Sequence, residues 1–298
     1  MTVLTSRNGL IEFGPGFPTL LINDQLRVMD QDPEVLQELR YGKFDQLMDI
    51  ARAGIEKGFQ VVDILINHPD LDETVLLPKI ARRINEELGC FISLDTRNPE
   101  ALDAALAAIR PTKALINSVT AEAPLLENLL PLARKYGAAL VGLPIGTNCG
   151  IPDTANGRLE QTRIILDAAQ AIGISKEDVV IDAICLASSA APDTFKTTLD
   201  TLSGLHRELG LSTILGIGNA GFGMPAPTWI DLAYILGAIP SGLDSALANP
   251  ATEGMVQSVL ALDFLVGNDP VGKRYIKYYR AHNKIGSRLS QTPSQPKN

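Results

Sequence analysis

Four short apolar runs, each ending in a carboxylate or an amide, decide the fold of this chain. They are Phe91-Ile-Ser-Leu-Asp95, Ala114-Leu-Ile-Asn117, Val179-Val-Ile-Asp182 and Ile214-Leu-Gly-Ile-Gly-Asn219. Turn residues and then a helical pattern follow each run. A buried strand that ends in a polar side chain places that side chain at the carboxyl edge of a parallel sheet. Four such groups from four strands can converge only if the sheet is closed or sharply wound.

Strand-like runs of this kind recur along the whole chain. We expect eight strands, near residues 19–23, 60–66, 91–95, 113–117, 139–144, 179–184, 213–219 and 242–248. Apolar residues spaced at i, i+3 and i+4 predict helices over 47–55, 125–133, 159–172, 195–209, 229–236 and 255–265. This alternation predicts an α/β protein, a single (β/α)₈ TIM barrel. An open, doubly wound sheet is the alternative, but no Gly-x-Gly-x-x-Gly motif opens the first helix.

Length, composition and charge agree with one barrel and argue against other classes. A chain of 298 residues fits a barrel of about 250 residues with extensions. Because no linker interrupts it, we expect one domain over 1–298, with the barrel at about 19–270 and a polar, basic C-terminal extension at 271–298. The formal charge of −8 argues against nucleic-acid binding. No apolar run approaches the ~20 residues that span a membrane.

The start of the chain and its cysteines predict a cytoplasmic location. The first seven residues lack the apolar segment of a secretion signal. Cys90, Cys149 and Cys185 are odd in number and show no Cys-x-x-Cys spacing, which favours reduced thiols over a disulfide framework.

A basic segment ends the chain and contains no acidic residue. Its cations are Lys273, Arg274, Lys277, Arg280, Lys284 and Arg288. We interpret it as a solvated final helix with a polar tail over 291–298. A docking strip for an acidic protein partner is the alternative.

The chemistry of the four strand-end groups points to a neutral, donor-rich ring. Two carboxylates and two amides, without a cationic cluster nearby, do not suit a phosphate. A carboxylate can instead accept two parallel hydrogen bonds from an amino group and an adjacent ring N–H. Each charge-assisted bond is worth about 1.5–3 kcal/mol. Pterin and guanine rings carry such an edge, whereas flavins and nicotinamides largely do not.

In order and spacing, the four runs resemble the pterin-binding barrel superfamily. That group contains dihydropteroate synthase, the folate domain of cobalamin-dependent methionine synthase and the methyltetrahydrofolate:corrinoid protein methyltransferases. The stretches Gly242-Leu-Asp-Ser-Ala-Leu-Ala-Asn-Pro250 and Gly146-Thr-Asn-Cys-Gly-Ile-Pro152 resemble the corrinoid branch. The resemblance covers about residues 19–265, and the ordered set is far more specific than any single motif.

The resemblance implies a methyltransferase that moves a methyl group between a cobalamin-carrying corrinoid protein and N5 of tetrahydrofolate. It implies that Asp95, Asn117, Asp182 and Asn219 bind the pterin, with Asn219 the catalytic residue facing N5. The corrinoid protein would be a partner, methyltetrahydrofolate a substrate or product, and the enzyme a homodimer. The cobalt chemistry belongs to the corrinoid, so no metal ligand is expected in this chain. The direction of transfer stays open.

Departures from the family pattern leave other functions open. The second strand reads Asp63-Ile-Leu65 where the family usually has Asp-x-Asn, and the first reads Ile22-Asn-Asp24 where the corrinoid branch commonly has Gly-Glu-Arg. The basic Ser-x-Lys/Arg signature of dihydropteroate synthases is absent from residues 216–225. The alternatives are a dihydropteroate synthase-like enzyme, a catalytically silent folate binder and an unrelated barrel lyase or aldolase.

Each chosen residue also has a purely structural interpretation. Asp95 could cap the helix that starts near Pro99. Ser118 and Thr120, which follow Asn117, could cap the next helix without Asn117. Asn219 could adopt positive φ in its glycine-rich loop. A zinc site from His68, Cys149 and Cys185 lacks ligand spacing. His206 is interpreted as structural, and Trp229 as part of a helix face packed on the barrel or of a subunit interface.

Overall fold

The structure, a computed structural model, describes residues 1–190 and 193–289. Eight parallel strands form a closed barrel in the order β10-β3-β4-β5-β6-β7-β8-β9, which confirms the predicted (β/α)₈ barrel. The barrel strands are β3 (Leu20–Arg27), β4 (Val61–Leu65), β5 (Phe91–Asp95), β6 (Leu115–Thr120), β7 (Ala139–Leu143), β8 (Val179–Asp182), β9 (Ser212–Gly216) and β10 (Ser245–Ala248). Each of the eight predicted runs overlaps one of them.

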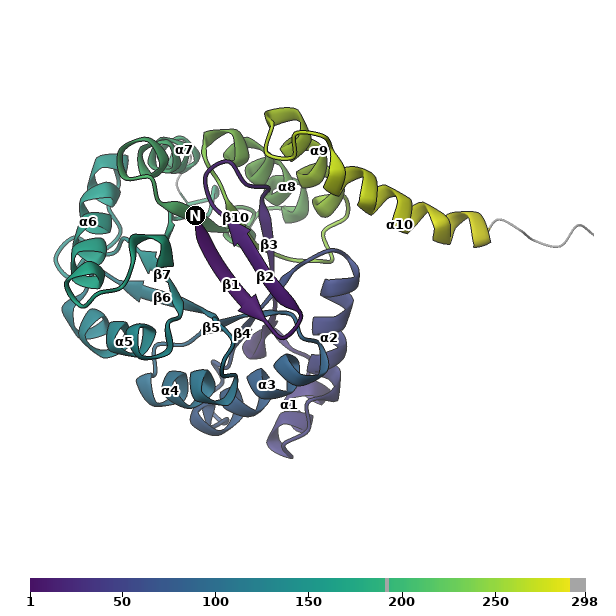
Figure 1. Ribbon diagram of the computed structural model, residues 1–298, viewed down its shortest axis with the longest axis horizontal. Coiled ribbons are helices and arrows are strands. Elements are labelled where there is room, and N and C mark those ends of the chain that lie inside the picture. Colours follow the sequence, from purple (N-terminus) through teal and green to yellow (C-terminus); the bar gives the residue numbers. More distant parts are fainter. Residues whose placement is uncertain (191–192, 290–298) are drawn as a thin grey trace, which may run out of the picture.

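Helices surround the barrel in Figure 1. Their apolar stripes pack on the outer faces of the strands and form the larger of two core clusters. The helices are α1 (Pro33–Arg40), α2 (Asp45–Glu56), α3 (Glu73–Glu87), α4 (Pro99–Ala108), α5 (Ala123–Tyr136), α6 (Ala155–Ala171), α7 (Thr194–Gly204), α8 (Pro227–Ala238), α9 (Met255–Val266) and α10 (Lys273–Leu289). Because helices cover the outer faces and side chains fill the interior, the strands are apolar at nearly every position.

Strand register brings the polar strand ends together. In the parallel ladders Leu65 is level with Asp95, and Asp95 is level with Asn117. On the other side of the barrel, Asp182 at the end of β8 is level with Ile214, the middle residue of the neighbouring strand β9. The polar residues that end these strands therefore lie at one end of the barrel, where such folds carry their sites.

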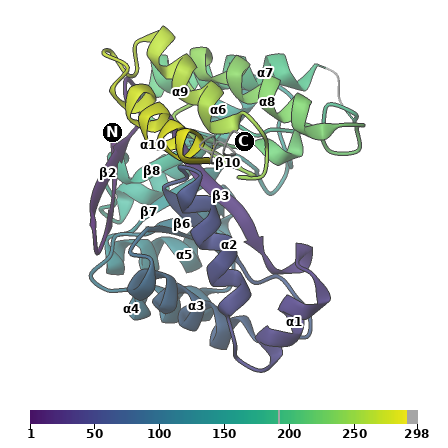
Figure 2. The same ribbon diagram turned by 90° about the vertical axis from the view of Figure 1, so that its right-hand side faces the viewer.

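An N-terminal hairpin covers the other end of the barrel, a feature that the sequence patterns did not predict. Strands β1 (Thr2–Ser6) and β2 (Gly9–Phe13) pair antiparallel and lie across the barrel in Figure 1. Leu4 and Phe13 are fully buried in the second core cluster, together with barrel-interior residues such as Ile22 and Val180. Figure 2 shows β2 and α1 at opposite sides of the barrel. The site end is therefore left open.

Helix α8 corrects one further expectation. Trp229 on α8 is 73% exposed, so it does not pack on the barrel, although Tyr234 and Ile235 of the same helix are buried. The predicted final helix exists as α10, and the tail over 291–298 lies outside the described residues. Among the described residues, none of the helices combines the length and apolarity needed to cross a membrane.

Candidate functional site

A cavity of about 260 Å³ opens at the carboxyl end of the barrel. All four of the predicted site residues line it, contributed by four different strands or the loops that follow them. Its polar lining comprises Asp24, Arg27, Asp63, Asp95, Arg97, Asn117, Ser118, Asp182 and Asn219. Backbone at Gly216 and Gly218 and the side chains of Leu143 and Leu247 complete it.

Asp95 is free to face this cavity because another residue caps the next helix. The N-cap of α4 is Asn98, whose Oδ1 accepts hydrogen bonds from Glu100 N (3.0 Å) and Ala101 N (3.3 Å). The capping interpretation of Asp95 is therefore wrong. Asn117 likewise caps no helix, because α5 begins after Glu122. Its Nδ2 instead donates to Asp63 Oδ1 at 3.3 Å, which ties the ends of β6 and β4 together.

Asp182 is held by the backbone that follows its strand. Its Oδ1 accepts a hydrogen bond from Ile184 N at 2.7 Å. Ile184 has φ of 65°, a region that β-branched residues rarely adopt. The Arg158 side chain, 1% exposed, stabilises this turn: its Nη1 donates to Ala183 O (2.7 Å) and Ile184 O (3.0 Å). Its Nε donates to Pro152 O (3.1 Å). Arg158 thus fixes the loop that orients Asp182.

The sequence patterns did not single out Arg158. The available signal was a cation at the start of an otherwise apolar helical repeat. Such a residue is costly to bury unless its N–H groups are satisfied, and here backbone carbonyl groups satisfy them.

Asn219 lies in the loop after β9, within a short 3₁₀ turn over Ile217–Asn219. It is exposed and does not have positive φ, so the left-handed interpretation is wrong. A Cβ built on Gly216 would lie 3.2 Å from Asn219 Nδ2. A side chain at position 216 would therefore crowd the amide, and glycine leaves it room at the cavity edge.

Carboxyl groups dominate the electrostatics of the cavity. Burial and, after it, the charge of Asp63 raise the pKa of Asp95 to about 8 against the opposing charges of Arg27 and Arg97. Burial also raises the pKa of Asp63, which is 2% exposed. Burial raises the pKa of Asp182 to about 6, against the Ile184 hydrogen bond and the charge of Arg158. Near neutral pH Asp95 therefore favours its protonated form, and a donor-rich ligand would displace that proton.

Asp24 and two arginines were missed as site residues. Burial raises the pKa of Asp24 to about 6, and the charge of Arg27 opposes the shift. Arg27 and Arg97 both line the cavity, which corrects the expectation that no cations lie nearby. The signal was present, because Arg27 is the last residue of β3 and Arg97 follows the end of β5. Arg97 lies two residues after Asp95, and Arg27 three after Asp24.

A second cavity, of about 440 Å³, adjoins the first and shares Asp24, Arg27 and Gly218 with it. It runs beneath the loop after β9, where Phe222 and Met224 line it. Asp231 in its wall accepts a hydrogen bond from Gly221 N at 2.9 Å. The loop that carries Asn219 is thereby tied to α8.

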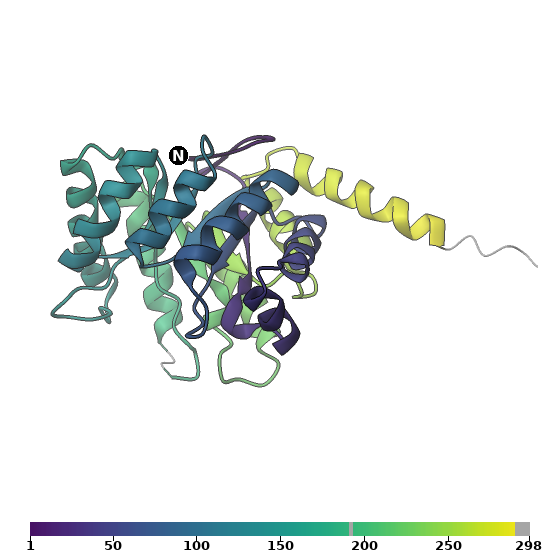
Figure 3. The ribbon, with the colours of Figure 1, turned by 90° about the horizontal axis from the view of Figure 1, so that it is seen from below.

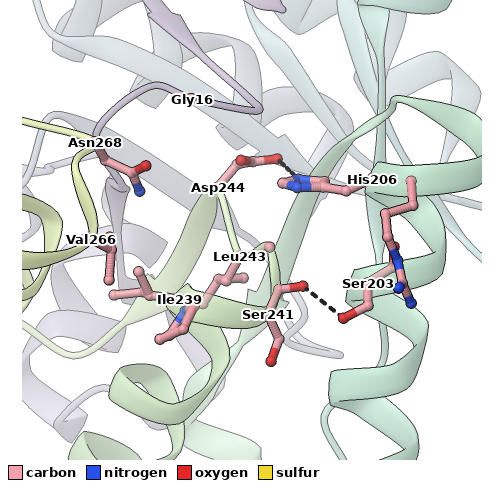
Figure 4. A pocket seen from close by; sticks show the side chains of 12 residues that line it. Gly16, Ser203, His206, Ile239, Ser241, Leu243, Asp244, Val266 and Asn268 are labelled. Carbon is pink, nitrogen blue, oxygen red and sulfur yellow. Dashed lines mark hydrogen bonds and ion pairs between the residues drawn. The ribbon is translucent and has the colours of Figure 1, made fainter.

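Figure 4 shows a different cavity, of about 380 Å³, at the amino end of the barrel. His206 Nε2 lies 2.8 Å from Asp244 Oδ2, which also accepts a hydrogen bond from Thr213 N at 2.9 Å. These contacts join the starts of β9 and β10 to the segment after α7. This agrees with the structural interpretation of His206, since the amino face of such barrels contributes to stability.

The proposed zinc ligands are not assembled in the structure. Cys149 is exposed, and Cys185 is buried. Burial raises the pKa of the Cys185 thiol to about 12, which disfavours the thiolate that zinc requires. Across residues 1–190 and 193–289, no three His, Cys, Asp or Glu side chains are grouped so as to hold a metal ion.

Known proteins match this fold and this site-bearing region. A methylcorrinoid:tetrahydrofolate methyltransferase of Eubacterium limosum is 26% identical over 245 residues, covering 80% of this chain and 89% of that protein. Methionine synthase of Mycobacterium tuberculosis is 23% identical over 219 residues, covering 69% of this chain but 18% of that longer protein.

Solved structures agree on the fold. A Yersinia pestis dihydropteroate synthase bound to a pterine-sulfa conjugate superposes with a TM-score of 0.67 at 17% identity, covering 89% of this chain and 98% of that one. The 7,8-dihydropteroate synthase of Vibrio fischeri gives 0.64 at 17% identity, covering 91% and 100%. At this identity the likeness concerns the barrel alone. The profile of the pterin binding enzyme family matches residues 32–247, most of the barrel and every predicted site residue, and the chain therefore belongs to that family.

Proposed function

We propose that this chain is a methyltransferase that moves a methyl group between a corrinoid protein and N5 of tetrahydrofolate. The observation that carries the proposal is one cavity that combines a set of carboxylate and amide acceptors with an exposed amide at its edge. Buried acceptors can hold the pterin ring, and the exposed amide of Asn219 can meet the ring atom that reacts. The name of the Eubacterium limosum relative supports the direction from corrinoid to folate.

The acceptors suit the pyrimidine edge of the pterin. Its amino group and adjacent ring N–H are parallel donors, which a carboxylate such as Asp182 can accept together. Asp95 and Asn117, level with each other in the sheet, can form the remaining hydrogen bonds with the ring. A cavity of about 260 Å³ is small for a binding site, so it fits the ring, and the rest of the folate extends toward the adjoining cavity.

The chemistry of this chain is alignment and charge stabilisation at N5. The corrinoid supplies the cobalt that gives or takes the methyl group. Methylation of N5 creates positive charge there before the N5 proton leaves, and demethylation needs that proton to arrive. The amide oxygen of Asn219 can accept a hydrogen bond from the protonated N5 in either direction. Because this bond is strongest when N5 is charged, it lowers the activation barrier of methyl transfer more than it strengthens the binding of tetrahydrofolate.

The test separates chemistry from binding. We expect Asn219→Ala to slow single-turnover methyl transfer about 10²-fold while weakening tetrahydrofolate binding much less. Asp182→Asn should weaken binding about ten- to a hundredfold, because it places a donor against ring donors. Asn8→Ala, at the far hairpin, is the matched control and should change neither quantity.

Two outcomes would contradict the proposal. Equal losses of rate and affinity in Asn219→Ala would make Asn219 a binding residue without a catalytic role. Tight tetrahydrofolate binding without any transfer to or from a corrinoid would leave a silent folate binder. Arg27 and Arg97 also make the dihydropteroate synthase reaction worth assaying, and condensation of a pterin pyrophosphate with p-aminobenzoate would replace the proposal.

A further inference from the structure

One carboxyl group lies where the two cavities at the open end of the barrel meet. Figure 3 shows helix α1, which follows β3, and the green loop that follows β9 at this end, opposite the N-terminal hairpin. Asp24, Arg27 and Gly218 line both cavities. Among the residues that the structure describes, Asp24 is the one carboxyl group that does so. The other carboxyl groups line one cavity each: Asp63, Asp95 and Asp182 the first, and Asp30 and Asp231 the second.

A β-bulge in β3 aims Asp24 at this position. Between Asn23 and Leu26 the ladder with β4 loses its regular register, so β3 carries one extra residue. Asn23 Oδ1 accepts a hydrogen bond from Gln25 N at 2.9 Å and holds the bulge. The Asn23 side chain points outward, against Gly54 of α2. Because successive side chains of a strand alternate and bulges redirect them, Asp24 points into the cavities.

The carboxylate of Asp24 has no fixed partner among the other side chains of the described residues. The nearby Arg27 lies 3.9 Å from Asp30 instead. By contrast, Asp182 Oδ1 accepts from Ile184 N, and Asp63 Oδ1 accepts from the Asn117 amide. Asp24 is therefore able to exchange a proton with a bound ligand.

The charges that face Asp24 come from several elements. Burial raises the pKa of Asp24 to about 6; of the nearby charges, Arg27 opposes this shift, and Asp63 on β4 and Asp231 on α8 contribute to it. The charged groups that line the same cavities are Asp30, Asp95, Arg97 and Asp182. Both forms of the Asp24 carboxyl group are therefore accessible close to neutral pH, as proton transfer requires.

The arrangement of a folate in these cavities brings its N5 atom to Asp24. In tetrahydrofolate, N5 is bonded to C6, and C6 carries the tail. With the pyrimidine edge on the strand-end acceptors and the tail in the adjoining cavity, N5 and C6 lie where the cavities meet. Asn219 is on the same side, because a Cβ built on the preceding Gly218 would lie 3.8 Å from Asp24 Oδ2.

We propose that Asp24 is a second catalytic residue, which takes the proton from N5 when N5 is methylated and returns it when N5 is demethylated. This inference rests on the proposed methyltransferase function. In methylation, the N5 lone pair forms the N–CH₃ bond as the Co–C bond breaks, cobalt keeps the electron pair of that bond, and the N5 proton then passes to the Asp24 carboxylate. In demethylation, protonated Asp24 gives its proton to N5, and the electron pair of the N–CH₃ bond returns to N5. Asn219 stabilises the charge on N5, and Asp24 removes it.

The first measurement is single-turnover methyl transfer from methyltetrahydrofolate to cob(I)alamin, with a separate titration of tetrahydrofolate. Asp24→Asn keeps the shape of the side chain and cannot give up a proton. We expect the transfer rate at neutral pH to fall at least about 10²-fold, with little change in tetrahydrofolate affinity. Asp24→Glu should recover part of the rate. Asp167→Asn, an exposed aspartate on α6, is the control and should keep the wild-type rate.

The pH dependence separates proton transfer from a structural role. The ratio of the wild-type rate to the Asp24→Asn rate, in which any titration of the folate or the corrinoid cancels, should change with pH around pH 6. Asn219→Ala removes a charge-stabilising amide and should keep the wild-type pH dependence. The unfolding midpoint of Asp24→Asn should not fall below that of the wild type, because folding disfavours the ionised carboxyl group that this variant lacks.

The outcomes distinguish this inference from the proposed function. An unchanged rate in Asp24→Asn, while the wild type transfers the methyl group, overturns this inference alone. A rate ratio that is the same at every pH, or equal losses of rate and affinity, would make Asp24 a structural or binding residue and overturn it as well. No transfer by the wild type in either direction overturns the proposed function, and this inference with it.

Discussion

Replacing Asp95 with asparagine should stabilise the ligand-free protein near neutral pH and weaken its binding of tetrahydrofolate. Asp95 is held in a cavity where burial and the neighbouring charge of Asp63 raise its pKa to about 8, from a usual value of 3.8. Folding therefore makes ionisation of this carboxyl group harder. The variant keeps the shape of the side chain and removes the ionisation.

The magnitude follows from the linkage between protonation and folding. The folded pKa is raised, so the unfolded chain binds fewer protons between about pH 4 and pH 8, and the stability of the wild type falls across that window. Each pKa unit corresponds to 1.36 kcal/mol, so about three units up to pH 7 give an upper bound of about 4 kcal/mol. Relaxation and water entry reduce such values, so we expect a gain of about 1–3 kcal/mol.

The assay is urea unfolding of the ligand-free protein at pH 4, 6 and 8, with Asp167→Asn, an exposed aspartate on α6, as the control for the change in net charge. The gain in free energy of unfolding should be absent near pH 4 and largest at pH 8. Tetrahydrofolate affinity should fall in the same variant. A gain in free energy of unfolding that is independent of pH, or a loss of stability at pH 8, would refute the view that folding favours the protonated form of Asp95.

Three further predictions concern the cavity, its support and the far end of the barrel. Tetrahydrofolate should bind more weakly as pH falls below about 8, because its ring N–H groups need ionised Asp95 and Asp182, whose pKa values are raised to about 8 and about 6. Binding should therefore release protons from the protein. Calorimetry in buffers of different ionisation enthalpy measures this release, and zero release contradicts the prediction. Arg158→Met should weaken tetrahydrofolate binding more at pH 6 than at pH 8, because losing the arginine charge raises the pKa of Asp182 further. Arg158→Lys should restore part of the affinity. Equal losses of affinity at both pH values would mean a purely structural effect. Asp244→Ala should lower the free energy of unfolding by about 2–4 kcal/mol through the lost contacts with His206 and Thr213, while tetrahydrofolate affinity stays unchanged; a large change in affinity would show that the amino end of the barrel influences the site.

The local patterns of this sequence were enough to predict the barrel. A strand buried on both faces must be apolar at nearly every position, so the eight runs and the helical repeats between them were visible without any tertiary information. Asp95, Asn117 and Asp182 could be placed at one end because a parallel strand fixes where its last residue lies. The order of the motifs then carried the family resemblance.

The tertiary structure alone decided which further groups join them. Asp63 was visible at its strand but was noted mainly as a departure, and its hydrogen bond with Asn117 depends on the register between strands. Arg97 lies in the loop after β5, whose course no periodicity predicts, and Arg27 ends β3 beyond the strand run expected from the sequence. Arg158 was visible as a cation on an apolar helical repeat, but its contact with Ala183, 25 residues along the chain, depends on how the helix packs on the loop.

The same division holds for the ends of the chain. The sequence indicated a basic final helix by its composition, because charge is a property of the residues alone. Whether that helix packs on its own barrel depends on where Asp269 and Arg274 anchor it, and only the folded chain brings those groups to Thr19. The sequence thus determined what each strand and helix can bury or expose, and the closure of the barrel decided which exposed groups meet.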